Sequence, residues 1–210
     1  MESQNPGVQF SIEAWDREIR IGDTSSEFYG LIEVMDNNPL VCADSMSVPG
    51  PGATLALIAL APLAQAGLIV DSPVLVLNFE DDHAEIEQAV ASVGWLDGLA
   101  IHAEPTDLSG VLAATAMVCV RSPLEFEELQ SLYEETFGRS FYIRSTEAAW
   151  TPDVVLQKPY AMYRLSIQTD HPTSLVTVRV LSDPNGKCGA SQVIHAMNVM
   201  CGFEESLGVS

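Results

Sequence analysis

The chain has 210 residues, 47% of them hydrophobic, which is enough to bury the core of one large domain or two small ones. Its 29 Asp and Glu residues against 9 Lys and Arg give a net charge of −20, which argues against nucleic acid and membrane surfaces as partners, since clustered cations bind both. The four cysteines have no metal-ligand spacing and no export signal is evident, so we expect reduced thiols in a cytoplasmic protein.

The beginning of the chain gives weak structural signals. Residues 1–27 are polar and acidic, with Phe10 and Trp15 as the best anchors, so we expect a poorly structured or extra N-terminal segment there. Residues 28–210 would then form the domain. The apolar residues 39–43 are typical of a short strand that leads into a Pro/Gly turn at residues 49–52.

An uncharged stretch at residues 45–70 is long enough to raise the question of a transmembrane helix. Its three prolines and the absence of Lys or Arg near either end favour a buried helix in a globular domain instead. We expect Thr54 to cap this helix, which would run to about residue 66 and stop at Gly67.

The middle of the chain alternates between strand and helix signals. Residues 73–79 are β-branched and apolar, which predicts a buried strand. Asp82 and Glu85 have the spacing of a capping box for a helix that ends at Gly94.

A second buried strand is predicted at residues 111–120, followed by an amphipathic helix that ends at Gly138. The start of this helix is indicated by a cap, a first-turn proline and a box partner, which are Ser122, Pro123 and Glu125. Its apolar stripe comprises Phe126, Leu129, Tyr133 and Phe137.

Period-two alternation predicts a hairpin of residues 162–168 and 175–181. The last helix, over about residues 189–201, would place four apolar side chains on one face: Val193, Ile194, Met197 and Met200. Strands joined by short turns, with helices between them, predict an α+β domain: a mixed, largely antiparallel sheet with helices on one face.

Few residues carry a chemical signature. The four histidines are scattered, so no metal site is expected. The acidic residues 80–82, followed by His83, suit an acid/base pair or a cation site, but carboxylates that stabilise a helix N-terminus are the more ordinary interpretation. The turn at residues 49–52 precedes a helix, where backbone N–H groups can bind an anion. Its two prolines remove two of these N–H donors and favour a plain turn.

The residues from Lys187 to Glu205, KCGASQVIHAMNVMCGFEE, closely resemble the ending KGAAGQAVQNMNLMFGLDE of N-acetyl-gamma-glutamyl-phosphate reductases. Other segments resemble that family in the same order, over about residues 28–207 in all. They are residues 29–33 (its YGLPE), 54–69 (the helix after its PGCYPT), 82–88 (its HTPEIEQ) and 111–144 (a strand and the helix that follows).

The resemblance implies the fold of a semialdehyde-dehydrogenase dimerisation domain. In that family a Rossmann domain binds NADP, a cysteine thiolate attacks an acyl phosphate, and a histidine acts as acid and base during hydride transfer. Only about residues 1–38 precede the strand of the nucleophile here, too few for a dinucleotide-binding unit. We therefore expect no cofactor, or NADP only if a partner chain supplies a Rossmann domain.

The positions that the resemblance assigns to chemistry hold other residues. The cysteine position is Pro51, and the substrate-binding arginine falls near Ser109. The catalytic histidine position is Glu80, and a second histidine position is Asp82. Cys188 is a substitute thiol, since a helix N-terminus lowers a thiol pKa, although a small buried cysteine is the common alternative.

Two functions of different classes stay open, and we favour the first. It is a non-catalytic homologue, a pseudoenzyme, that acts as a homodimer or through another protein partner; the homodimer is expected because both faces of the strand at residues 175–181 are apolar. The alternative is an oxidoreductase-related enzyme or subunit that acts on an amino-acid-derived metabolite. Its remodelled pocket would use, besides His195, the residues Glu80, Asp82, Asp107, Ser109, Lys187 and Cys188.

Overall fold

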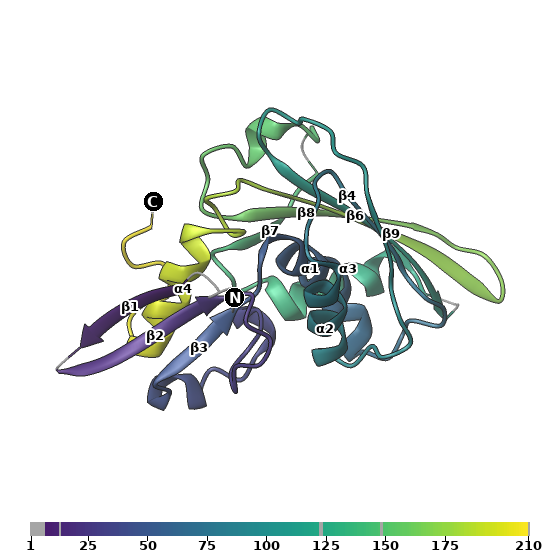
Figure 1. Ribbon diagram of the computed structural model, residues 1–210. Helices are drawn as coiled ribbons and strands as arrows, with labels where there is room; N and C mark the ends of the chain where they lie inside the picture. The colour runs from purple at the N-terminus through teal and green to yellow at the C-terminus, as the bar shows by residue number, and fades with distance from the viewer. Residues whose placement is uncertain (1–6, 13, 122–123, 148, 210) are drawn as a thin grey trace.

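The computed structural model describes residues 7–12, 14–121, 124–147 and 149–209. In this part of the chain two sheets lie side by side, a small one at one end and a large one that carries most of the helices (Figure 1). The small sheet has the order β1 (Gly7–Ile12), β2 (Trp15–Ile21), β3 (Ser45–Val48). The large sheet has the order β5 (Ala100–Ala103), β4 (Val74–Leu77), β6 (Leu112–Arg121), β9 (Thr173–Ser182), β8 (Ala161–Gln168), β7 (Ile143–Ser145).

The large sheet is mixed but largely antiparallel, as predicted. β4, β6, β9 and β8 pair antiparallel in the centre, and β5 and β7 pair in parallel at the two edges. The helices α1 (Pro51–Gln65), α2 (His83–Ser92) and α3 (Phe126–Phe137) cover one face (Figure 1), and α4 (Ala190–Cys201) packs against the small sheet. The α+β fold class is therefore confirmed.

The helix α1 is the centre of the main core. Its side chains are buried along almost its whole length, because it contacts α2 and α3 on its sides and the central strands β6 and β9 beneath it. The uncharged stretch of the sequence is thus a buried helix of 15 residues. Within the described ranges, no helix has both the length and the apolar character that a bilayer crossing requires.

The N-terminal residues expected to be poorly structured form a hairpin in the part that the structure describes. β1 pairs antiparallel with β2, and β2 pairs in parallel with β3. Arg17 fixes this hairpin to the rest of the fold, since its buried guanidinium donates to the carbonyl oxygens of Ala43 and Met200. Their polar composition concealed these strands, because no residue of β1 is fully buried and only Arg17 and Ile19 of β2 are.

Two predictions near α1 are wrong. Residues 39–43 were expected as a strand, but Pro39–Cys42 is a 3-10 helix, which suits a proline in its first position, and the strand begins at Ser45. Thr54 does not cap α1, because Pro51 already occupies the first helical position. The Thr54 hydroxyl lies inside the helix and donates to the Pro49 carbonyl at 3.2 Å.

The later helices differ in detail from their predictions. The N-cap of α3 is Glu125, which forms its capping box with Glu128; the predicted start residues Ser122 and Pro123 lie outside the described residues. Of the predicted stripe, Phe126 is exposed while the others are buried. In α4 the predicted face is only half-buried, except for Met200; the more deeply buried side carries Gln192, His195, Ala196, Asn198 and Val199.

Candidate functional site

The N-terminus of α1 is the place where the resemblance puts the reactive residue. Gly50 is the N-cap and Pro51 the first helical residue. The backbone N–H of Gly50 donates to Oε1 of Glu85 at 2.7 Å, and that of Gly52 donates to Oδ2 of Asp81 at 2.6 Å. The turn is therefore not a plain one. It binds two carboxylates, and both belong to the chain itself.

These carboxylates reach α1 because α2 packs against it. Asp82 is the N-cap of α2, as predicted, and accepts from the Ala84 N–H at 2.9 Å. Its predicted box partner Glu85 is turned towards α1 instead. The approach is close: a Cβ atom on Gly52 would stand 2.7 Å from Oδ2 of Asp81, so the contact requires a glycine.

Glu85 has a second donor, which the segment before the first 3-10 helix supplies. The Tyr29 hydroxyl donates to Oε1 of Glu85 at 2.9 Å. Burial raises the pKa of the Glu85 carboxyl, whereas its hydrogen bonds from Gly50 and Tyr29 work in the opposite direction. Burial and the nearby Glu85 charge also raise the pKa of Tyr29 well above its ordinary value, which keeps its phenol protonated and able to donate.

Cys188 lies beside the same helix end but is not an activated thiol. Its Sγ atom is 3.8 Å from the carbonyl oxygen of Pro51, and the side chain is buried. Burial raises the pKa of the Cys188 thiol to about 12. The residue therefore stays protonated at neutral pH, which is the small buried cysteine that the sequence offered as the alternative.

Lys187 belongs to a separate, fully buried network. Its Nζ atom is 2.7 Å from Oε1 of Glu33 and 3.2 Å from Nδ1 of His195. Burial alone would raise the pKa of the Glu33 carboxyl, but the charges of Lys187 and His195 hold it below its usual range. Burial lowers the pKa of Lys187. The sequence places Lys187 in a remodelled pocket, but the contacts observed join it to buried side chains of the chain itself.

The imidazole of His195 connects this ion pair to the C-terminal segment. Its Nε2 atom is 3.0 Å from Oε2 of Glu205, and its ring stacks on that of Tyr142 with 4.3 Å between the centroids. Burial, and then the Lys187 charge, lower the pKa of His195. The Tyr142 hydroxyl in turn donates to the Glu205 carbonyl at 2.9 Å.

The predicted pocket residues are spread over different surroundings. Glu80, Asp82, Asp107 and Ser109 are exposed, and Asp107 accepts from the Gly110 N–H at 3.0 Å. Lys187 and Cys188 are buried, each with the partners given above. Within the described ranges, no three His, Cys, Asp or Glu side chains are gathered as a metal ion would require.

Sequence analysis missed three residues that matter here: Glu33, Asp81 as an acceptor for α1, and Glu85 as its neighbour. Glu33 had a usable signal, since both it and Lys187 stand in segments that resemble the same family. Asp81 and Glu85 had none, because their partners Gly52 and Gly50 lie 29 and 35 residues away.

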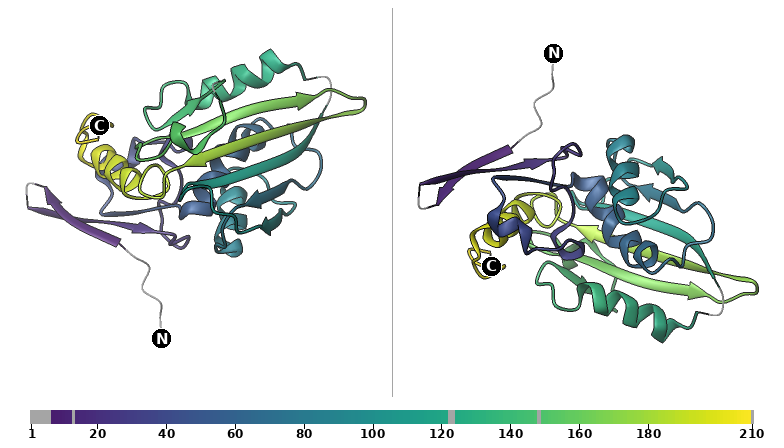
Figure 2. Two further views of the ribbon diagram at one scale, coloured as in Figure 1. Left: turned by 90° about the horizontal axis from the view of Figure 1, so that it is seen from above. Right: turned by 90° about the horizontal axis from the view of Figure 1, so that it is seen from below.

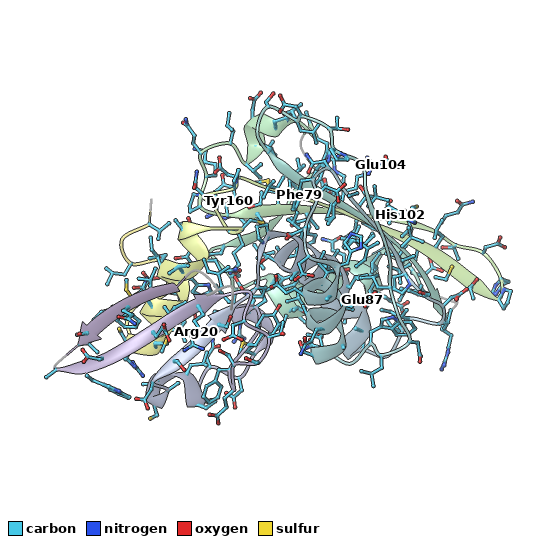
Figure 3. The ribbon with its side chains drawn as sticks, viewed as in Figure 1. Arg20, Phe79, Glu87, His102, Glu104 and Tyr160 are labelled. Atoms are coloured by element: carbon cyan, nitrogen blue, oxygen red, sulfur yellow. The ribbon has the colours of Figure 1, made fainter. Side chains whose placement is uncertain are left out.

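Replacing Glu85 with alanine should lower the free energy of unfolding by about 1–3 kcal/mol, because the Gly50 N–H and the Tyr29 hydroxyl both lose their acceptor. The matched control is Glu87→Ala on the same helix (Figure 3), which is exposed and should change it by less than about 0.5 kcal/mol. Urea denaturation measures both. Equal effects of the two substitutions would show that Glu85 does not hold α1.

No family model matches the chain. In sequence it is 25% identical over 214 residues to the N-acetyl-gamma-glutamyl-phosphate reductase of Bacillus cereus (strain 03BB102), covering 86% of this chain and 61% of that protein. The enzyme of the same name from Bacillus mycoides (strain KBAB4) is 24% identical over 200 residues, covering 80% of this chain and 57% of that protein. The chain is related to the N-acetyl-gamma-glutamyl-phosphate reductases. It spans about three fifths of the length of these curated relatives.

A solved structure shows the same fold. Aspartate semialdehyde dehydrogenase II from Vibrio cholerae, complexed with ASA, matches with a TM-score of 0.54 at 15% sequence identity, covering 82% of this chain and 64% of that one. This likeness concerns the fold alone. It agrees with the α+β domain that the resemblance to the reductase family implies.

NADP, the cofactor that the reductase resemblance implies, does not fit the residues described. A dinucleotide-binding unit needs several parallel strands connected by helices, with a glycine-rich turn at a helix N-terminus. Among the described residues each parallel pairing joins only two strands. In the large sheet these are β4 with β5, connected by α2, and β7 with β8; in the small sheet β2 pairs with β3, and the elements between them are two 3-10 helices. The helix N-terminus next to this sheet, that of α1, already binds two carboxylates.

Proposed function

We propose that the chain is a non-catalytic relative of the N-acetyl-gamma-glutamyl-phosphate reductases that acts by protein association, first of all with a second copy of itself. The observation that carries the proposal is the closed N-terminus of α1. Pro51 stands where the resemblance puts a cysteine, and the free N–H groups on either side of it bind Glu85 and Asp81. An acyl phosphate would meet two carboxylates there instead of open donors.

The surface proposed for association is the face of the large sheet that the helices leave uncovered. We call it the outer face and define it by residues that the strand register places side by side: Met117, Cys119, Leu175, Thr177 and Arg179. Met117 is 37% exposed and Leu175 39%, whereas Val176 and Val178 on the opposite face are fully buried. Apolar side chains of this size on an exposed sheet favour a partner surface.

Charge supports the same surface. None of the six strands of the large sheet contains an Asp or Glu, although the chain has 29. The strands do contain arginines and His102, which is exposed on β5 (Figure 3). Repulsion between two chains of charge −20 is screened beyond about 8 Å at physiological ionic strength, whereas apolar burial is not. A two-fold symmetric contact is the expected form.

The test combines an assay with a mass measurement. With N-acetyl-glutamyl phosphate and NADPH, the purified chain should show neither NADPH binding nor NADPH consumption. Light scattering at tens of micromolar should give at least twice the 22.7 kDa chain mass, and Met117→Glu should lower that mass. Turnover that is lost in a Glu80 variant would refute the non-catalytic assignment, and a monomeric wild-type chain would refute association.

A further inference from the structure

The N-terminal hairpin carries a second surface. β1 stands at the edge of the small sheet, and among the described residues it pairs with β2 alone. One side of its backbone therefore has N–H and C=O groups without strand partners. Figures 1 and 2 show the hairpin projecting from the body of the molecule, which leaves this edge open to another chain.

This edge lacks the features that protect sheet edges in soluble proteins, which are charged side chains, proline, bulges and short length. β1 has six residues, Gly-Val-Gln-Phe-Ser-Ile, without a charge or a proline, and all six pair with β2 in continuous register. Val8 is 44% exposed. In a chain with a net charge of −20, an uncharged and apolar edge is conspicuous.

Charge favours a second copy of this chain as the occupant. The only charged residues of β1 and β2 are Asp16, Arg17, Glu18 and Arg20, so the two strands are together neutral. Arg20 is paired with Glu18 at 2.8 Å. Two copies can therefore approach along this edge without the repulsion that acts between the rest of their surfaces.

The alternation of side chains along β1 also favours a second copy of this chain as the partner. Val8, Phe10 and Ile12 share one face of β1, and Phe10 packs against the apolar cluster of α4 and the small sheet. An antiparallel pair of β1 strands about a two-fold axis keeps these faces together when Gln9 lies opposite Gln9, or Phe10 opposite Phe10. In either register the exposed Val8 gains an apolar neighbour, Phe10 or Ile12 of the second copy.

We propose that β1 pairs antiparallel with β1 of a second copy, which joins two small sheets into one sheet of six strands. This contact is distinct from the outer face and goes beyond the function proposed above. With both contacts the chain forms assemblies larger than a dimer, since each contact uses its own two-fold axis.

The experiment isolates the β1 contact by first removing the other. In the Met117→Glu background, light scattering at tens of micromolar should give twice the 22.7 kDa chain mass. Adding Gln9→Lys and Ser11→Lys should return the mass of one chain, because both registers then place Lys opposite Lys of the second copy. Within the hairpin the two lysines lie opposite Glu18 and Asp16 of β2, so the hairpin itself keeps its pairing. The control pair Gln88→Lys and Gln157→Lys adds the same charge at exposed sites outside both surfaces and should leave the dimer intact.

Hydrogen exchange supplies a second readout. In the Met117→Glu variant, the amides of residues 7–12 should exchange more slowly as the protein concentration rises. A Met117→Glu variant that is monomeric overturns the β1 proposal and leaves the outer face intact. If Met117→Glu leaves the wild-type mass unchanged while Gln9→Lys with Ser11→Lys lowers it, the outer face is refuted and the β1 contact is supported. If the amides of residues 7–12 exchange slowly in a monomeric protein, residues of the same chain protect the β1 edge, and the proposal is overturned.

Discussion

Replacing Lys187 with methionine should lower the free energy of unfolding by about 3–5 kcal/mol, one of the largest effects expected of any single substitution here. Methionine fills a similar volume but leaves the Glu33 carboxylate, which is 4% exposed, without its cation. Denaturant titration measures the change. The control is Lys158→Met, an exposed site, which should change the free energy of unfolding by less than about 0.5 kcal/mol.

A second variant separates the charge from the packing. Adding Glu33→Gln to Lys187→Met removes the unpaired charge, so the double variant should be more stable than Lys187→Met alone. If the two substitutions instead add their separate costs, the 2.7 Å contact between Nζ of Lys187 and Oε1 of Glu33 is not an energetic pair.

Replacing Val178 with aspartate should prevent folding, at a cost of about 4 kcal/mol or more. Val178 is fully buried in the centre of the large sheet, on the face that α1 covers. A carboxylate there would have no water and no cation. Circular dichroism should show loss of the cooperative transition.

The adjacent residue is the control. Thr177 immediately precedes Val178 on β9. Its side chain lies on the outer face and is half-buried. Thr177→Asp should fold, and its effect should appear in the mass measured by light scattering. A folded, cooperative Val178→Asp variant would contradict the position of α1 over this strand.

A sequence pattern predicts a helix or strand well when the burial of its side chains follows the period of that element. The alternation in β8 and β9 was readable because one face of each strand is covered and the other is not. The polar strand β2 was missed because it has little apolar alternation of its own and one of its two partners is distant: β3 begins more than twenty residues after β2 ends. Local composition carries no information about such a partner.

The candidate site was predicted less completely than the fold. The resemblance located Pro51 and Lys187. The structure places Pro51 at the first position of α1 and Lys187, fully buried, in the turns that precede α4. What closes the site is a pair of hydrogen bonds between elements, from Gly50 to Glu85 and from Gly52 to Asp81. The capping-box spacing predicts that Glu85 binds the N-terminus of its own helix. Because α2 packs on α1, Glu85 binds the N-terminus of α1 instead.

The order in which these elements leave the ribosome matters for how the chain folds. Lys187 is synthesised 154 residues after its partner Glu33. The strand β9, which pairs with both β6 and β8 in the centre of the large sheet, also comes late, and α4, against which the small sheet packs, comes later still. The large sheet is therefore incomplete until β9 has been synthesised, and the small sheet, whose strands end at Val48, lacks its packing partner α4 until later still. Until then the apolar helix α1 lacks one of the two central strands that it packs against, so we expect the domain to fold only after β9 and α4 have been synthesised.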